Sequence, residues 1–213
     1  MPTHKTRQTS AIVAIMLVAV LLGIAAATYY QRPPAPSTIP GLLWPNPKML
    51  GEFSVLDQNG KAFTLAQLKD KWSLLFFGFT HCPDICPNTL QLMQQMEKRL
   101  KSLPEQNDSQ FIFVSVDPKR DTPKIMHDYL DYFSKDFIGL TGDPQVEELN
   151  RQIGVIAILG QADENGSYSV DHSASVFIID PAGRMVGKLS LPHTLENMLD
   201  TYQKIRSYIE DNS

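Results

Sequence analysis

WSLLFFGFTHCPDICPN, residues 72–88, decides the fold, because it combines a buried strand, a polar turn and the start of a helix. Residues 72–79 are mostly large apolar and aromatic side chains, which is typical of a central strand covered on both faces. Two prolines and an acidic residue follow within residues 80–87, and residues 88–101 have helix-forming composition with apolar side chains three and four positions apart. This order places the turn at the carboxyl end of a strand, where open sheets bind ligands.

The turn holds the only two cysteines of the chain, Cys82 and Cys86. On a helical turn their Cα atoms are about 6 Å apart, within the range that a disulfide permits. Two convergent thiolates equally suit one soft metal ion such as Cu(I). A purely structural disulfide is disfavoured, because so short a loop gains little stability, and the flanking prolines and polar neighbours argue against burial of the thiols. The C-x3-C spacing leaves a redox-active pair and a metal-binding pair open.

Composition indicates one globular domain with appendages, since the chain has 213 residues and 43% hydrophobic composition. Lys5 and Arg7 precede the first apolar run and no acidic residue precedes Glu52, so the body of the chain is more acidic than the net charge of −4. No basic stripe with interleaved aromatic residues is found. This pattern excludes direct nucleic-acid binding as the expected function.

The N-terminus predicts a membrane anchor. Residues 11–27 carry no charge, and the basic residues in front orient residues 1–10 to the cytoplasm by the positive-inside rule. We expect a transmembrane anchor at residues 11–28 in the inner (cytoplasmic) membrane, crossed once, with the C-terminal domain in the periplasm. The competing interpretation is a cleaved signal peptide, because Ala25-Ala26-Ala27 supplies small residues at A-x-A spacing.

A proline-rich segment separates the predicted anchor from the domain. Six of its residues are prolines, which predicts a semi-extended tether at residues 29–47, followed by one domain at residues 48–213. The apolar stretch GLLW, residues 41–44, is expected to dock on the domain as a clip.

The domain alternates predicted strands and helices. Asn59-Gly60 predicts a hairpin of residues 53–56 with 62–64. Further strands are predicted at residues 111–116, 137–140, 153–159, 168–172, 175–180 and 185–189, and helices at 122–133, 143–152 and 195–209. This alternation, which ends in a hairpin, predicts an α/β domain with a mixed central sheet flanked by helices.

A third metal ligand is expected from one of five histidines. His4 lies on the cytoplasmic side of the predicted anchor. His127 belongs to a charged amphipathic helix and His193 begins the last helix, so solvated or capping roles are favoured for both. His81 adjoins the cysteines, and His172 lies in a loop that leads into an apolar strand. Both of these remain candidates on the residues alone.

Three segments together resemble the Sco/SenC family: GFTHCPDICP (78–87), VSVDPKRDTP (114–123) and VDHSASVFIID (170–180). The resemblance covers nearly everything after the predicted anchor. It implies a membrane-anchored thioredoxin-like domain that binds copper, as Cu(I) or Cu(II), and helps to load the binuclear copper site of cytochrome c oxidase. Residue by residue, it implies Cys82, Cys86 and His172 as the metal ligands.

The resemblance implies a metallochaperone more than an enzyme, with the copper-bearing subunit of cytochrome c oxidase as its partner. Since the cysteines face an oxidising compartment, a thiol reductant protein is a second expected partner. The alternative is a thiol–disulfide oxidoreductase of the cell envelope in which Cys82 and Cys86 are redox-active. A thioredoxin-type reductase is a weaker match, because the spacing is C-x3-C and no proline lies between Val155 and Asp180.

Several acidic and basic residues of the matched motifs have a structural interpretation. Asp117, Arg120 and Asp121 are expected to form a turn and to cap the following helix. Asp84, between the cysteines, is expected to be a solvated loop acid or to tune the thiolate charge.

Overall fold

The computed structural model describes residues 15–26, 38–164 and 168–212. The chain divides into two units, Met1–Ala35 and Pro36–Ser213. In the first unit residues 15–26 are helical, and the large apolar side chains of this helix are exposed. None of the helices in the described ranges combines the length and the apolar character needed to cross a membrane. The other residues of the predicted anchor and the predicted cytoplasmic segment 1–10 lie outside the described residues, so the anchor stays a prediction.

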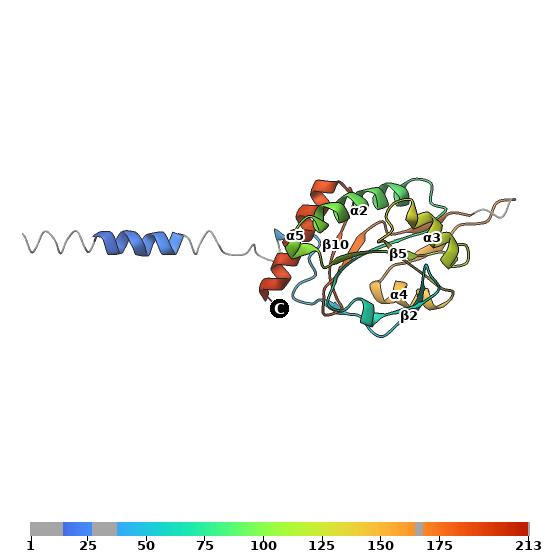
Figure 1. Ribbon diagram of the computed structural model, residues 1–213, viewed down its shortest axis with the longest axis horizontal. Helices are drawn as coiled ribbons and strands as arrows, with labels where there is room; N and C mark the ends of the chain where they lie inside the picture. Colours follow the sequence, from blue (N-terminus) through green and yellow to red (C-terminus); the bar gives the residue numbers. More distant parts are fainter. Residues whose placement is uncertain (1–14, 27–37, 165–167, 213) are drawn as a thin grey trace, which may run out of the picture. The chain divides into compact units, whose positions relative to one another are not determined.

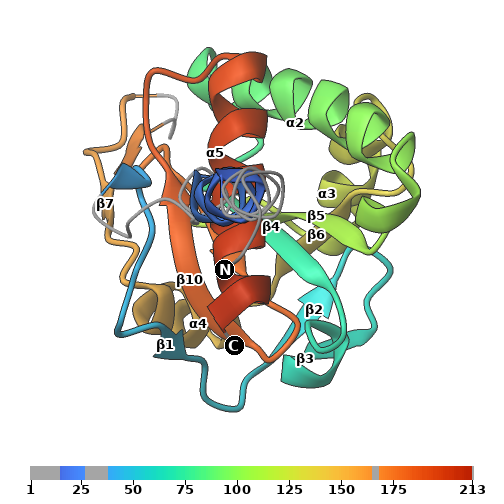
Figure 2. The same cartoon turned by 90° about the vertical axis from the view of Figure 1, so that its left-hand side faces the viewer.

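The second unit is built on a mixed eight-stranded sheet (Figures 1 and 2). Its strands, in spatial order, are β1 (Lys48–Met49), β10 (Arg184–Leu189), β9 (Val176–Ile179), β4 (Trp72–Gly78), β5 (Ser109–Ser115), β6 (Ile138–Thr141), β2 (Ser54–Asp57) and β3 (Ala62–Thr64). The three central strands β4, β5 and β6 are parallel, and the other neighbours are antiparallel. The predicted α/β domain with a mixed sheet is confirmed.

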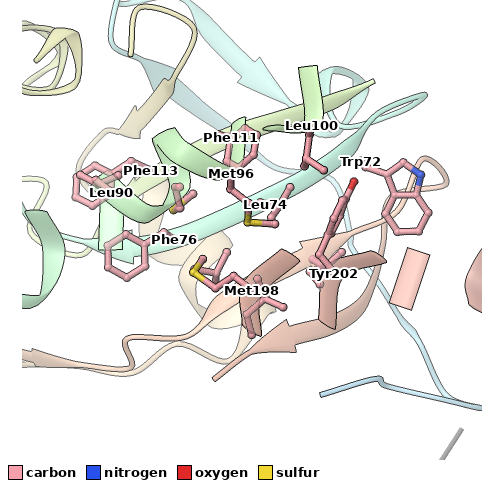
Figure 3. Packing of buried hydrophobic residues seen from close by; sticks show 14 of the residues in the cluster. Trp72, Leu74, Phe76, Leu90, Met96, Leu100, Phe111, Phe113, Met198 and Tyr202 are labelled. Atoms are coloured by element: carbon pink, nitrogen blue, oxygen red, sulfur yellow. The ribbon is translucent and has the colours of Figure 1, made fainter. Parts of the chain in front are cut away.

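Strand β4 is buried over its whole length because both faces of the sheet are covered. Its side chains alternate between two hydrophobic clusters, as the two-residue period of a strand requires. Trp72, Leu74 and Phe76 belong to the cluster that includes residues of α2 and α5 (Figure 3). Leu75 and Phe77 belong to the cluster that includes residues of α4. The long apolar run at residues 72–79 is therefore explained by burial on two sides.

Four α-helices accompany the sheet: α2 (Ile85–Lys101), α3 (Pro123–Asp131), α4 (Gln145–Ile153) and α5 (Leu195–Asn212). Two short 3-10 turns, η2 (Leu65–Gln67) and η3 (Pro104–Gln106), also belong to the described part of this unit. Helices α2 and α5 lie side by side, whereas α4 contacts β2 and β6 (Figure 1). Helix α2 starts three residues earlier than the predicted Asn88, because a proline at position 87 falls in the first helical turn, where no intrahelical N–H bond is required.

The segment before β1 packs on the domain. Ile39 is buried in the cluster beneath α5, Leu42 pairs with Gly187 of β10, and Trp44 contacts the ring of Tyr208 edge-on at 5.6 Å. The predicted docking of residues 41–44 is confirmed. Residues 29–37 of the predicted tether lie outside the described residues.

One strand was predicted wrongly. The apolar run 153–159 forms only the short strand β7 (Ala157–Leu159), which pairs with β8 (Val170–His172) in a separate two-stranded sheet. The first residue of the run ends helix α4, and Gly154 terminates that helix in the left-handed conformation. The side chains of Ile156 and Ile158 are exposed, so the composition of this run does not reflect burial in the main sheet.

Candidate metal centre

Cys86 lies in the first turn of α2, against the carboxyl end of β4. It is fully buried, and a Cβ atom added at Gly78 of β4 would stand only 2.8 Å from its sulfur. A glycine at this strand end therefore makes the space that the sulfur occupies. The expectation that polar neighbours keep both thiols from burial is wrong for Cys86, because the helix starts early and turns this side chain inward.

Cys82 precedes the helix and is half-buried, and both cysteines are free thiols. The two are not on one helical turn, as the spacing had suggested, since α2 begins at Ile85. Cys82 nevertheless lies close enough to affect the Cys86 thiol. Burial, reinforced by the neighbouring Cys82 thiol, raises the pKa of the Cys86 thiol far above its usual range. In the dithiol form Cys86 is therefore protonated at neutral pH.

His172 ends β8 and comes to the same place from a position 86 residues further along the chain. Its Nε2 atom lies 3.8 Å from the sulfur of Cys86. Its Nδ1 atom lies 3.0 Å from the carbonyl oxygen of Ser173. Because a carbonyl oxygen only accepts hydrogen bonds, Nδ1 carries the proton, and in neutral imidazole Nε2 presents its lone pair towards Cys86.

Aromatic rings hold the imidazole in place. The ring of His172 contacts Phe79 edge-on at 5.9 Å and Phe76 at 6.5 Å between centroids. Burial is the main cause that lowers the pKa of His172 below its usual 6.5, so the neutral form dominates at neutral pH. Neutral imidazole is the form that binds metals.

The distance between the two donor atoms fits a shared soft metal ion. Bonds of about 2.3 Å to sulfur and 2.0 Å to nitrogen, at an angle near 120°, separate the donors by about 3.7 Å. The observed separation of 3.8 Å matches this value. Across residues 15–26, 38–164 and 168–212, no three His, Cys, Asp or Glu side chains form a ready-made metal cluster.

Asp121 anchors the cysteine turn, residues 80–86. This buried carboxylate accepts hydrogen bonds from the backbone N–H of Thr80 at 3.2 Å and from its hydroxyl at 2.6 Å. It also accepts a bond of 2.8 Å from the hydroxyl of Ser115 at the end of β5. Burial raises the pKa of Asp121, while the three donated bonds oppose that effect.

The predicted capping role of Asp121 is wrong. Thr122 is the N-cap of α3, and its hydroxyl accepts from the backbone N–H of Ile125. Asp121 instead joins the ends of β4 and β5, two parallel strands whose carboxyl ends meet at one edge of the sheet. No pattern in the sequence predicts its contact with Thr80, which lies 41 residues away.

The other candidates lie elsewhere. His81 is exposed and its Nδ1 hydrogen-bonds the hydroxyl of Thr80 at 3.0 Å. His127 is exposed beside Asp128, and His193 lies 2.7 Å from the carbonyl oxygen of Ala174 through Nε2. His4 lies outside the described residues. Asp84 is exposed and accepts from the side chain of Asn88 at 2.7 Å, as expected for a solvated acid at the start of a helix.

Comparison with known proteins matches this chain to one family. The family model described as SCO1/SenC matches residues 44–210. The mitochondrial SCO2 homologue of Bos taurus is 36% identical over 72% of this chain and 58% of its own length. An SCO2-like protein of Rickettsia conorii is 32% identical over 91% of this chain and 96% of its own.

Solved structures agree in fold. ScoI of Arabidopsis thaliana with copper bound has a TM-score of 0.69 at 35% identity and covers 74% of this chain and 98% of its own. ScoI of Bradyrhizobium japonicum with copper bound has a TM-score of 0.65, also at 35% identity, over 75% of this chain and 99% of its own. BsSco has a TM-score of 0.59 at 25% identity over 79% of this chain and 98% of its own. It is described as a member of the Sco family of cytochrome c oxidase assembly proteins in which a disulfide switch was identified. The fold is therefore the thioredoxin-like α/β fold of these proteins.

Proposed function

Because the chain belongs to the SCO1/SenC family, we propose that it binds one copper ion through Cys82, Cys86 and His172 and delivers it to the binuclear copper site of cytochrome c oxidase. Copper is cargo in this proposal, and the protein is a carrier. Copper-bound structures of relatives at 35% identity support the choice of metal.

One observation carries the proposal, which is the approach of His172 to Cys86. Nothing in the chain connectivity requires the two to meet, yet Nε2 and the sulfur lie 3.8 Å apart with the lone pair of the neutral imidazole directed inward. Two sulfur donors and one imidazole suit copper, since thiolates favour Cu(I) and imidazole also suits Cu(II).

The burial of Cys86 has a consequence for loading. Its thiol is protonated in the free protein, so copper must displace a proton and binding should weaken as the pH falls. Cys82 is half-buried and is the cysteine that an incoming or outgoing carrier reaches first. Transfer by ligand exchange would then begin at Cys82 and end with release from Cys86.

A second function has its own support. Cys82 is close enough to Cys86 to raise the pKa of its thiol, and only Cys82 is accessible, as in a dithiol that attacks through one sulfur and resolves through the other. A thiol–disulfide oxidoreductase acting on an oxidase subunit would use this pair. Oxidation removes both thiolates, so copper binding and disulfide formation exclude each other, and the carrier needs a thiol reductant protein.

The proposed location follows from the residues before the domain. A helix at residues 15–26 with exposed apolar side chains supports an anchor in the inner membrane, with the C-terminal domain in the periplasm. A protease-protection assay on sealed spheroplasts tests this orientation. Cleavage of the domain only after lysis would contradict it.

The test of the ligand set is His172→Ala, with the exposed His127→Ala as the matched control. We expect His172→Ala to keep its fold and its dithiol reduction but to lose tight copper binding, most of all for Cu(II). Cys82→Ser and Cys86→Ser should abolish copper binding and thiol exchange together. Wild-type copper affinity in His172→Ala would exclude this histidine and favour His81 as the nitrogen ligand.

A further inference from the structure

The hairpin that carries His172 has weak backbone ties to the rest of the domain. Its strands β7 and β8 form a two-stranded sheet of their own and share no ladder with the eight-stranded sheet in the part of the chain that is described. Backbone hydrogen bonds to the main sheet therefore do not set the position of His172. Side-chain contacts and the three-residue connection to β9 do so, and Tyr168, four residues before His172, makes polar contacts with Asp117 and Arg120.

Tyr168 is held by a turn that follows β5. Its hydroxyl donates a hydrogen bond of 2.8 Å to the carboxylate of Asp117, which is 2% exposed. The other oxygen of the same carboxylate accepts from Nε of Arg120. Both oxygens of a buried, charged group are thus bonded, and one of the bonds reaches the hairpin.

Arg120 packs against the face of the same tyrosine ring. The guanidinium carbon lies 3.7 Å from the centroid of the Tyr168 ring, and Nη2 donates to the Tyr168 carbonyl oxygen at 3.1 Å. The same guanidinium lies 5.7 Å from the ring of Phe79, which in turn contacts the ring of His172. A planar cation suits a position between two rings, where a lysine would lose both the stacking and the fork of donors.

The turn also reaches the cysteines. Asp121, four residues after Asp117, bonds Thr80 at the start of the cysteine turn, and Ser115 joins the two acids by donating to Asp121 and accepting from the N–H of Asp117 at 3.0 Å. Five consecutive residues therefore contact both halves of the candidate metal centre, which come from segments far apart in the sequence.

We propose that residues 117–121 are a positioning turn that holds the His172 hairpin, through Tyr168, at the distance from Cys86 that copper requires. The copper part of this proposal rests on the proposed function, whereas the hold on the hairpin does not. Asp117 and Arg120 touch no ligand atom and act through Tyr168. Loosening this hold should leave the cysteines in place and let His172 move away from them.

The test uses the full-length reduced chain in detergent and the variant Tyr168→Phe, which keeps the ring under Arg120 and removes only the bond to Asp117. We expect amide hydrogen exchange at Val170–His172 to become at least tenfold faster, with exchange in β4 unchanged. Arg120→Lys should act in the same direction. Cu(II) affinity should fall about 10- to 100-fold, the usual effect of removing a partner that orients a metal site.

Asp180→Asn is the matched control, because Asp180 is another buried acid that pairs with an arginine, Arg184, but at the far end of β9. It should leave exchange at Val170–His172 and the nitrogen hyperfine signal of bound Cu(II) as in the wild type. Unchanged hairpin exchange in both Tyr168→Phe and Arg120→Lys would overturn the positioning turn. Faster exchange with unchanged copper affinity would support the turn and instead contradict His172 as a ligand.

Discussion

Replacing Gly78 by alanine tests whether the end of β4 sets the position of the Cys86 sulfur. The added Cβ would lie 2.8 Å from that sulfur and 2.7 Å from the ring edge of Phe113, where ordinary contact begins at 3.4 Å. The sulfur would have to move by about 0.6 Å, and neither neighbour is the free end of a long side chain. Overpacking of this kind costs about 1–3 kcal/mol.

We therefore expect Gly78→Ala to lower the free energy of unfolding by about 2 kcal/mol, which corresponds to a fall in melting temperature of about 4–8 °C for a domain of this size. The displaced sulfur should also become more accessible. Urea unfolding of the reduced protein measures the first effect, and the rate of Cys86 alkylation in a Cys82→Ser background measures the second.

Gly139→Ala provides the control on β6. Its Cβ would meet Leu130 at 2.7 Å and Met126 at 3.1 Å, both at the ends of flexible side chains and away from the cysteines. It should cost less stability and leave the reactivity of Cys86 unchanged. If Gly78→Ala were as stable as the wild type, with the same alkylation rate, the packing argument for this glycine would be refuted.

Three further predictions concern pH and stability. Because burial lowers the pKa of His172, its contribution to stability is present above the unfolded pKa of 6.5 and is lost as the pH falls through the lower folded pKa. The free energy of unfolding in urea should therefore fall over this pH range in the wild type and change less over the same range in His172→Gln. Thr122→Ala should lower the free energy of unfolding by about 1 kcal/mol, measured by thermal unfolding, because it removes the N-cap hydrogen bond from the N–H of Ile125. Thr122→Ser keeps a hydroxyl at this position and should keep the wild-type stability. Asp108→Asn should lower the free energy of unfolding by about 1 kcal/mol, because it weakens two charged hydrogen bonds from the nearly buried Arg206. The expected loss is modest because the Asp108 side chain is 41% exposed, and an unchanged melting temperature would contradict it.

Local sequence predicted most elements of the domain because their patterns are strong. The hairpin around Asn59-Gly60 forms as β2 and β3, and the run at residues 72–79 forms the central strand β4. Residues 153–159 misled the prediction, since apolar composition does not distinguish a buried strand from an exposed hairpin arm.

The sequence by itself determined the two cysteines, their turn after a buried strand and the short list of histidines, because these depend on residue type and on neighbours within about ten positions. Only the tertiary structure decided that Cys86 is buried while Cys82 is not, and that His172 reaches the sulfur whereas His81 faces solvent. The physical reason is that β4, β5 and the β7–β8 hairpin bring their ends together at one edge of the sheet. Such a meeting depends on sheet order and packing, which no local pattern encodes.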